Sequence, residues 1–215
     1  SVNAGDWLLI SGTPFLTRLM FGGIFKPKIK IPGMDIAGQI EAVGKDVTQF
    51  QAGDEVFGDL SECGFGAFAE YVCGIEAALV PKPTNISFEQ AATVPAAALT
   101  ALQGLRDCGQ IRSGQKVLIN GAAGGVGSFA VQIAKAFGAE VTVVCSTSKM
   151  EMVKSIGADN AIDYTQTDVT KNGQQYDLIL DVAAYRSVFD YQPILKADGT
   201  YVLVGGSISR LFQVL

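Results

Sequence analysis

The chain of 215 residues has no histidine and little charge, and both absences narrow what it can do. Histidine is the commonest metal ligand and the side chain best suited to proton transfer near neutral pH, so neither role can rest on it here. Only 17% of the residues are charged and the net charge is −5, which argues against a nucleic-acid-binding surface. The one dense basic run, Lys26 to Lys30, alternates with Pro27 and Ile29 and is typical of a solvated extended segment.

Long apolar runs and paired cysteines are also missing. No run approaches the roughly 18 to 20 residues that span a bilayer, and the first residues lack the basic and apolar regions of a signal peptide. We therefore expect a cytoplasmic protein with no membrane span. The four cysteines form no CxxC pair, which argues against a zinc ribbon or a disulfide framework and favours reduced thiols at Cys63, Cys73, Cys108 and Cys145.

The rhythm of the sequence changes along the chain and predicts two domains. Residues 1–92 carry short strand-like runs and frequent glycine turns, which indicate a mostly β, barrel-like unit. Residues 93–215 come to alternate apolar runs with longer helical patterns, which is typical of βαβ units in a parallel sheet. The strands expected in that sheet are Lys116–Asn120, Glu140–Cys145, Asn160–Tyr164, Tyr176–Val182 and Gly199–Gly205.

Helices are predicted at the junction of the domains and after the first of these strands. Ser87, with Gln90 three residues later, has the pattern of a capping box. Pro95 interrupts that helix, and an alanine-rich run to Leu105 predicts a second one. Farther on, one apolar helix face is formed by Val126, Phe129, Ala130, Ile133, Ala134 and Phe137.

The stretch Val117–Gly127 runs from an apolar strand through a glycine turn into that amphipathic helix. A bound pyrophosphate has to approach bare backbone and the first amides of a helix, so side chains must be absent there. Gly124, Gly125 and Gly127 are expected to supply this clearance, whereas Ala122 replaces the first glycine of a GxGxxG pattern. The strand–turn–helix–strand context favours dinucleotide binding, and a purely structural glycine turn is the alternative.

The end of the second of these strands favours NADPH over NADH. An acidic residue there would accept hydrogen bonds from a free ribose 2′-hydroxyl. The sequence instead has Ser146, Thr147 and Lys149, whose hydroxyls and ammonium can hydrogen-bond to a 2′-phosphate and neutralise it. The alternative is that Ser146 or Thr147 merely caps the next helix and that Lys149 is solvated.

With these motifs the chain resembles the medium-chain dehydrogenase/reductase superfamily, in particular its quinone oxidoreductase and zeta-crystallin-like branch. The resemblance covers essentially all 215 residues, and the order of its motifs along the chain is what makes it specific. The motifs are Ser1–Asp6, Pro32–Gly38, Gly53–Val56, Gly66–Tyr71, Thr100–Leu102, the glycine turn, Gly157–Asp159 and Ile162–Tyr164.

The resemblance implies an α/β protein with a GroES-like, mostly β catalytic domain over residues 1–92. Residues 93–215 should form a Rossmann domain, a doubly wound parallel sheet that binds NADPH, with the active site in the cleft between the domains. We also expect further strands before Ser1, and another Rossmann strand and a return segment after Leu215. A longer chain is expected to form a homodimer, because the family's usual dimer contact lies on that further strand.

Zinc-dependent relatives carry a cysteine where this chain has Asn3, and a histidine and a glutamate where it has Met34 and Asp35. Asparagine and methionine make poor zinc ligands, and the closely spaced cysteines of the structural zinc lobe are absent from the sequence, so we expect a metal-free protein. By resemblance, Asn3 is a hydrogen-bond donor to the enolate-like oxygen that hydride addition creates. Asp6 is interpreted either as orienting Asn3 or as an ordinary surface or turn aspartate.

Further cofactor contacts follow from the resemblance and from the strand ends. Tyr164 resembles the family position beside the 2′-phosphate and adenosine. The ends of the fourth and fifth strands should line the ribose and nicotinamide, because ligands of open parallel sheets collect there. The predicted cofactor-binding set is Thr100, Ala122, Gly124, Gly125, Val126, Ser146, Thr147, Lys149, Tyr164, Val182, Ala183, Val204 and Gly205.

Two functions from different classes fit this sequence. The first is a zinc-independent, NADPH-dependent oxidoreductase that transfers hydride to a small quinone, enone or enal. The second is a non-catalytic, NADPH-binding accessory protein of the same fold. No proton donor is identifiable, and bulk water is the expected source of the proton. The apolar segment Trp7–Phe25 is interpreted as a substrate lip, a dimer contact or core.

Overall fold

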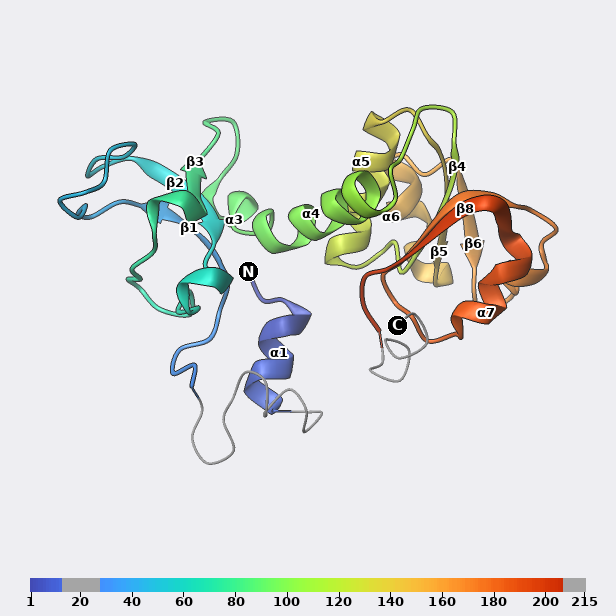
Figure 1. The fold of residues 1–215 in the computed structure, drawn as a ribbon, viewed down its shortest axis with the longest axis horizontal. Coiled ribbons are helices and arrows are strands. Elements are labelled where there is room, and N and C mark those ends of the chain that lie inside the picture. Colours follow the sequence, from blue (N-terminus) through green and yellow to red (C-terminus); the bar gives the residue numbers. More distant parts are fainter. Residues whose placement is uncertain (13–27, 207–215) are drawn as a thin grey trace. The chain divides into compact units, whose positions relative to one another are not determined.

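The computed structural model describes residues 1–12 and 28–206 and divides the chain into two compact units, Ser1–Ala97 and Ala98–Leu215 (Figure 1). The division falls a few residues after the boundary expected at residue 92, inside helix α4 (Pro95–Leu102). None of the helices in the described ranges is long and apolar enough to cross a membrane.

The first unit contains an antiparallel sheet. Strands β1 (Asp35–Gln39), β2 (Glu55–Asp59) and β3 (Leu79–Pro81) lie in the order β1-β2-β3, and Asp35 pairs with Asp59. These strands confirm the short strand-like runs that the sequence predicts for this part of the chain. Over the described part of this unit the strands form this one sheet.

Helix α1 (Ala4–Ser11) is a feature that the sequence analysis misses. Its residues are apolar almost throughout, so they lack the contrast between two faces that marks a helix in a sequence. Trp7 and Ile10 on this helix are 65% and 58% exposed, so this part of the apolar segment Trp7–Phe25 is not core. Its remaining residues, from 13 on, lie outside the described ranges.

The helices predicted at the junction are confirmed. Ser87 Oγ accepts a hydrogen bond from the Gln90 amide at 3.2 Å, and Gln90 Oε1 accepts one from the Ser87 amide at 3.0 Å, which caps α3 (Phe88–Ala91). Pro95 is the first residue of α4, a position where its missing N–H is no loss. The helical turns continue past the predicted end at Leu105 through a π-helical segment, Gln103–Cys108.

The second unit is built on a five-stranded parallel sheet. Its strands are β4 (Lys116–Asn120), β5 (Glu140–Cys145), β6 (Asn160–Asp163), β7 (Tyr176–Asp181) and β8 (Leu195–Leu203), in the order β6-β5-β4-β7-β8. All five predicted strands are confirmed, with β8 beginning earlier than expected. The chain moves outward from β4 through β5 to β6 and then returns to the other side of β4, so β4 and β7 flank the topological switch point of a doubly wound sheet.

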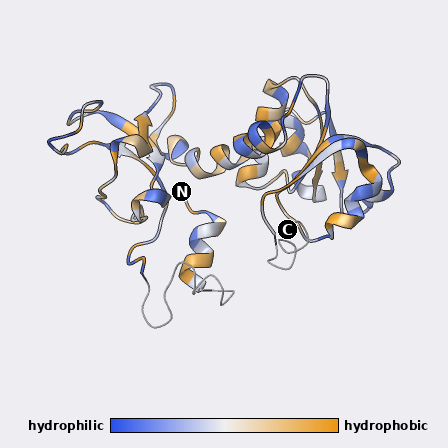
Figure 2. Cartoon of the chain, in the orientation of Figure 1, coloured by the Kyte–Doolittle hydropathy of each residue, from blue (hydrophilic) through white to orange (hydrophobic). Residues whose placement is uncertain are grey.

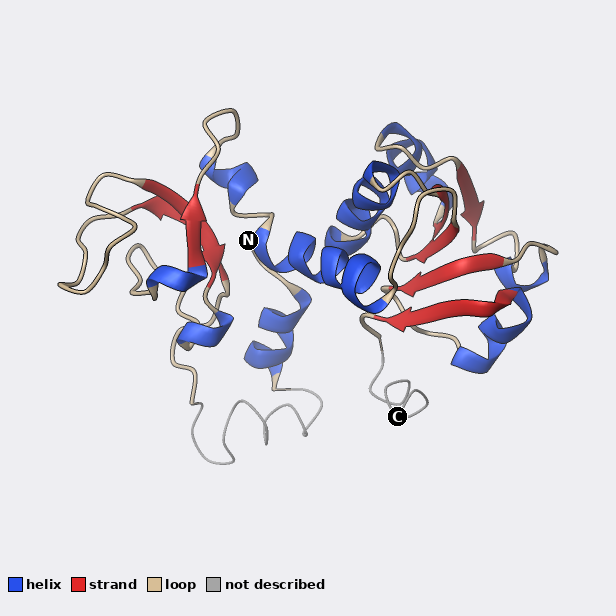
Figure 3. Cartoon of the chain, turned by 45° about the horizontal axis from the view of Figure 1, so that its top comes forward, coloured by secondary structure: helices blue, strands red, loops and turns tan. Residues whose placement is uncertain are grey.

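Apolar side chains are buried on both faces of this sheet. Figure 2 shows much of the ribbon of its strands in the hydrophobic colour. One face packs against the π-helical segment, α5 (Gly125–Ala136) and α6 (Met150–Ser155), which bury Leu105, Ala130 and Val153. The opposite face packs against Val169 and the turns around α7 (Val188–Tyr191). The sheet thus lies between two layers of helices and turns (Figure 3), which leaves the ends of its strands to form a site.

Candidate functional site

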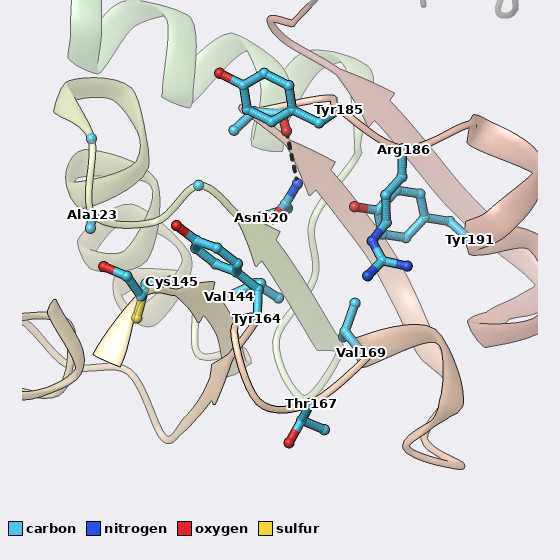
Figure 4. Close-up of a pocket in the computed structure, with 14 residues that line it drawn as sticks. Asn120, Ala123, Val144, Cys145, Tyr164, Thr167, Val169, Tyr185, Arg186 and Tyr191 are labelled. Atoms are coloured by element: carbon cyan, nitrogen blue, oxygen red, sulfur yellow. Dashed lines mark hydrogen bonds between the residues drawn. The ribbon is translucent and has the colours of Figure 1, made fainter. Parts of the chain in front are cut away.

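A pocket of about 530 Å³ opens at the carboxyl ends of β4, β5, β6 and β7, at the switch point of the sheet (Figure 4). Open parallel sheets bind their ligands in this position. The predicted cofactor-binding residues Gly124, Ser146, Tyr164 and Ala183 line it. The other lining residues are Asn120, Gly121, Ala123, Val144, Cys145, Thr167, Val169, Tyr185, Arg186 and Tyr191.

The glycines of the turn after β4 serve different purposes. Gly121 has φ +81°, a backbone conformation that side chains rarely adopt. A Cβ on Gly127 would lie 2.2 Å from the Gly121 carbonyl oxygen, so this glycine permits the helix to pack on the turn. The prediction that Gly127 provides clearance for a ligand is therefore wrong. At Gly124, which is exposed, a Cβ would meet one atom, the Gly121 carbonyl oxygen, at an ordinary 3.6 Å.

Helix α5 begins directly at this pocket. Gly124 is its N-cap residue with extended backbone, and Gly125, the first residue of the helix, is exposed. The first amides of a helix have no carbonyl partner within it and lie at the positive end of the helix dipole. The helix has twelve residues, and bare backbone at its open N-terminus is suited to a pyrophosphate. The turn therefore fits the pyrophosphate that the sequence predicts.

Three hydrogen-bonded side chains, of which Asp181 is fully buried, connect strands β4, β7 and β8. Asn120 Nδ2 donates to Asp181 Oδ1 at 2.8 Å and to the Ala183 carbonyl oxygen at 3.1 Å, and the Tyr201 hydroxyl donates to Asp181 Oδ2 at 2.7 Å. Asp181 is fully buried, and this burial raises the pKa of its carboxyl group. No motif in the sequence indicates a role for Asn120, Asp181 or Tyr201.

The loop after β5 carries the residues predicted to select NADPH. Ser146 lines the pocket, and Thr147 and Lys149 are exposed. The alternative that Ser146 or Thr147 caps the following helix finds no support, because neither the Thr147–Lys149 turn nor α6 has a side-chain cap hydrogen bond. The Thr147 hydroxyl donates instead to Asp163 Oδ2, at the end of β6.

Asp163 is a carboxylate that the sequence analysis overlooks beside this loop. It is buried, and it also accepts hydrogen bonds from the Thr165 amide at 2.9 Å, the Thr165 hydroxyl at 2.7 Å and Gln166 Nε2 at 3.2 Å. The hydrogen bonds from Thr147 and then Thr165 lower the pKa of this carboxyl group, so it is ionised at neutral pH.

Most of the remaining predicted residues lie around the pocket without lining it. Ala122 is buried under the turn, and Val182, Val204 and Gly205 take part in the backbone hydrogen bonds that extend β7 and β8. Thr100 is half-buried on α4. Gly125 and Val126 form the first turn of α5.

One wall of the pocket comes from residues for which no sequence motif gives a signal. Figure 4 shows Arg186 and Tyr191 near Val169, away from the side that carries Cys145 and Tyr164. Arg186 Nη1 forms an ion pair with Asp168 Oδ1 at 2.9 Å. Val169, Arg186 and Tyr191 follow β6 and β7 along the chain, so only the position of the strand ends could identify them.

The predicted catalytic residues Asn3 and Asp6 lie in the first unit, where a second carboxylate also holds Asn3. Asp6 is fully buried and accepts hydrogen bonds from the main-chain amides of Asn3, at 2.8 Å, and Gly33, at 3.1 Å. It is therefore no surface aspartate, and it holds the main chain of Asn3, as the first of the two interpretations expects. Asn3 Nδ2 donates to Asp35 Oδ2 at 2.7 Å, so Asp35 orients this side chain.

Asp35 stands where, by the resemblance, zinc-dependent relatives carry a glutamate, and protein donors occupy both of its oxygens. Besides Asn3, the Ser1 hydroxyl donates to Oδ2 at 2.6 Å and the Ala96 amide donates to Oδ1 at 2.8 Å. Among the residues that the structure describes, no three histidine, cysteine, aspartate or glutamate side chains lie together as a metal site would require. This donor set fits a hydrogen-bonded anchor better than a zinc centre.

Comparisons with known proteins bear on both units. Residues 1–84 match the alcohol dehydrogenase GroES-like domain family, and residues 125–213 match the zinc-binding dehydrogenase family. The chain is 38% identical over 191 residues to a 2-methylene-furan-3-one reductase of Solanum lycopersicum, covering 85% of this chain and 48% of that protein. It is also 38% identical over 191 residues to the chloroplastic NADPH-dependent alkenal/one oxidoreductase of Arabidopsis thaliana, covering 85% of this chain and 49% of that protein.

A solved structure gives the same picture. The quinone oxidoreductase of Pseudomonas syringae pv. Tomato DC3000 superposes with a TM-score of 0.78 at 30% identity, over 99% of this chain and 67% of that one. The chain spans about half the length of the two curated relatives.

Proposed function

The chain belongs to the quinone oxidoreductase branch of the medium-chain dehydrogenase/reductase superfamily, and we propose that it is an NADPH-dependent oxidoreductase that transfers hydride to a quinone or an α,β-unsaturated carbonyl compound without zinc. One observation carries the proposal: the exposed Gly124 backbone, at the start of α5, borders a pocket at the switch point of a parallel sheet.

Different residues around this pocket bind different parts of the cofactor. The turn at Gly124 and Gly125 holds the pyrophosphate, and Ala183 borders the ribose and nicotinamide. Ser146 and Lys149, with Tyr164 beside them, bind the 2′-phosphate, because a hydroxyl and an ammonium suit a phosphate dianion better than a free 2′-hydroxyl. Bound there, NADPH supplies a hydride from its nicotinamide ring.

Asn3 provides the hydrogen bond that the substrate oxygen needs as it gains negative charge. A carboxamide nitrogen has two protons. One is donated to Asp35, and we assign the second to the substrate oxygen. The same group supports the proposed zinc independence, since Asp35 is engaged by Ser1, Asn3 and Ala96 and the oxygen is stabilised by hydrogen bonding.

The location and the assembly of the protein stay predictions. The Arabidopsis relative is named as chloroplastic, so a cytoplasmic location is not general among similar proteins. We keep the cytoplasm as the proposed location and a homodimer as the proposed assembly of the full-length protein.

The proposal is tested by following NADPH oxidation by the full-length protein with benzoquinone and with a short enal, and by repeating both assays with NADH. Gly124→Ala separates binding from folding, because the added Cβ has ordinary room and φ −85° suits alanine. We expect this variant to keep its unfolding midpoint and to lose about tenfold in NADPH affinity, the scale of one charge-assisted hydrogen bond. Gly44→Ala, where a Cβ meets nothing within 4 Å, is the matched control.

The outcomes separate the candidate functions. Acceptor-dependent oxidation that favours NADPH supports the oxidoreductase. Tight NADPH binding without oxidation of either acceptor supports the non-catalytic accessory protein instead. A preference for NADH contradicts the role given to the loop after β5.

A further inference from the structure

The Asp163 carboxylate joins the two loops that carry the 2′-phosphate residues. Its Oδ2 accepts the Thr147 hydroxyl from the loop after β5, and its Oδ1 accepts the Thr165 amide and hydroxyl from the loop after β6. Gln166 Nε2 adds a further donor to Oδ2 at 3.2 Å. Asp163 is 7% exposed, so these hydrogen bonds are made away from solvent.

Strand pairing brings the same loops together at the main chain. Asp163 pairs with Cys145 in the parallel register of β5 and β6, and the Tyr164 amide donates to the Cys145 carbonyl oxygen at 3.2 Å. Ser146 therefore follows one member of this pair and Tyr164 follows the other, and both line the pocket. A group that fixes Thr147 to Asp163 also fixes the spacing between Ser146 and Tyr164.

The number of protons decides what Thr147 can do. A threonine hydroxyl has one proton, and here it is donated to Asp163. A phosphate dianion needs donors, so Thr147 cannot give that proton to Asp163 and to a phosphate at once. The contact of Thr147 with the cofactor that the sequence predicts becomes an indirect one.

We propose that Asp163 is a positioning residue for cofactor discrimination, holding Thr147 so that Ser146, Lys149 and Tyr164 are arranged for a 2′-phosphate. The proposal rests on the proposed NADPH-binding function. The hydrogen bonds from Thr147 and Thr165 lower the pKa of the Asp163 carboxyl group, so it acts as an anionic acceptor throughout the neutral range.

Simple electrostatics predicts the opposite effect of Asp163 on NADPH binding, so an experiment can distinguish the two explanations. A carboxylate near a phosphate repels it, so on charge alone Asp163→Asn should strengthen NADPH binding. In Asp163→Asn the one remaining carbonyl oxygen must accept the Thr165 main-chain amide, which can only donate, so the NH2 group faces Thr147 and cannot accept its hydroxyl proton. Asp163→Asn should then weaken NADPH binding although it removes a negative charge.

The experiment measures the dissociation constants of NADPH and NADH for the full-length protein by calorimetry. For Asp163→Asn and Thr147→Val we expect the preference for NADPH over NADH to fall about tenfold, the scale of one hydrogen bond to a charged group. The double variant should lose no more than either single one, because both remove the same contact. Thr147→Ser keeps the hydroxyl and should keep the preference.

Thr170→Val is the matched control, since the Thr170 hydroxyl donates to Asp168 at 2.8 Å in the same kind of contact. Its preference should equal that of the wild type. A tighter NADPH complex in Asp163→Asn, or an unchanged preference in Thr147→Val, overturns the inference. The proposed function still stands in that case if the wild-type protein prefers NADPH. A wild-type preference for NADH overturns both.

Discussion

The two units of the chain combine apolar burial with buried carboxylates in different proportions. In the second unit, which also buries Asp163 and Asp181, β4 and β7 bury apolar side chains completely on both faces of the sheet, including Leu118, Ile119 and Leu180. In the described part of the first unit the strands have only three to five residues, and the same number of carboxylates is buried, Asp6 and Asp35. Each of them accepts hydrogen bonds from segments far apart in the sequence.

This difference shows how a short-stranded unit can be fixed where little apolar area is available. A buried carboxylate is tolerated when donors surround it, and it then becomes costly to remove, because the donors lose their partners. The first unit should therefore be sensitive to a few polar substitutions, and the second to changes of side-chain volume.

The largest effect is expected from a cavity in the second unit. Leu180→Ala removes a fully buried side chain from β7 and should lower the free energy of unfolding of this unit by about 2–5 kcal/mol. Urea denaturation followed by far-ultraviolet circular dichroism measures the loss. Leu99→Ala, at a position 50% exposed on α4, is the matched control, expected within about 0.5 kcal/mol of the wild type. Equal effects of the two would contradict a core on β7.

The next effect is expected in the first unit. Asp35→Ala leaves the Ser1 hydroxyl, the Asn3 carboxamide and the Ala96 amide without their acceptor, which should cost about 1–3 kcal/mol. The one tryptophan of the chain, Trp7, lies in this unit, so its fluorescence during denaturation reports the change. Glu41→Ala, at an exposed position, should leave the transition unchanged. A stable Asp35→Ala protein would show that the unit does not depend on its buried carboxylates.

The pH dependence of stability should distinguish Asp163, a hydrogen-bonded carboxylate of the second unit, from the apolar core of that unit. Hydrogen bonding lowers the pKa of Asp163 in the folded protein, so its contribution to stability is present above the unfolded pKa of about 3.9 and is lost as the pH falls through the lower folded value. The stability difference between the wild type and Asp163→Asn should therefore shrink on acidification below about pH 4. Denaturation of both proteins across this range measures it. The cost of Leu180→Ala should not follow this pattern.

The smallest effect on stability is expected at Glu76, a carboxylate of the first unit whose hydrogen bonds are exposed to solvent. Its Oε1 accepts hydrogen bonds from the amides of Thr48, at 2.9 Å, and Gln49, and these bonds lower its pKa. Glu76→Gln should speed hydrogen exchange at these two amides without moving the unfolding midpoint. A shifted midpoint would place Glu76 with the buried carboxylates.

The sequence could predict most of the second unit and less of the first. A parallel sheet covered on both faces produces continuous apolar runs, so the strands and the glycine turn are recognisable locally. Helix α1 has no polar face and gives no such signal. The contacts of Asp35 and Asp163 join residues far apart in the chain, and they depend on strand pairing that no local pattern contains. The roles of Gly124 and Gly127 differ because of the atoms beside them, which a glycine motif does not distinguish.

The hydrogen-bonded group of Asn120, Asp181 and Tyr201 has a consequence for ligand affinity. It joins β4, β7 and β8 by their side chains at the edge where the pocket opens. The conformational entropy of these side chains is lost when the unit folds, before any ligand arrives. A nucleotide that binds there contacts side chains that are already ordered, so little of its interaction energy is consumed in ordering the protein.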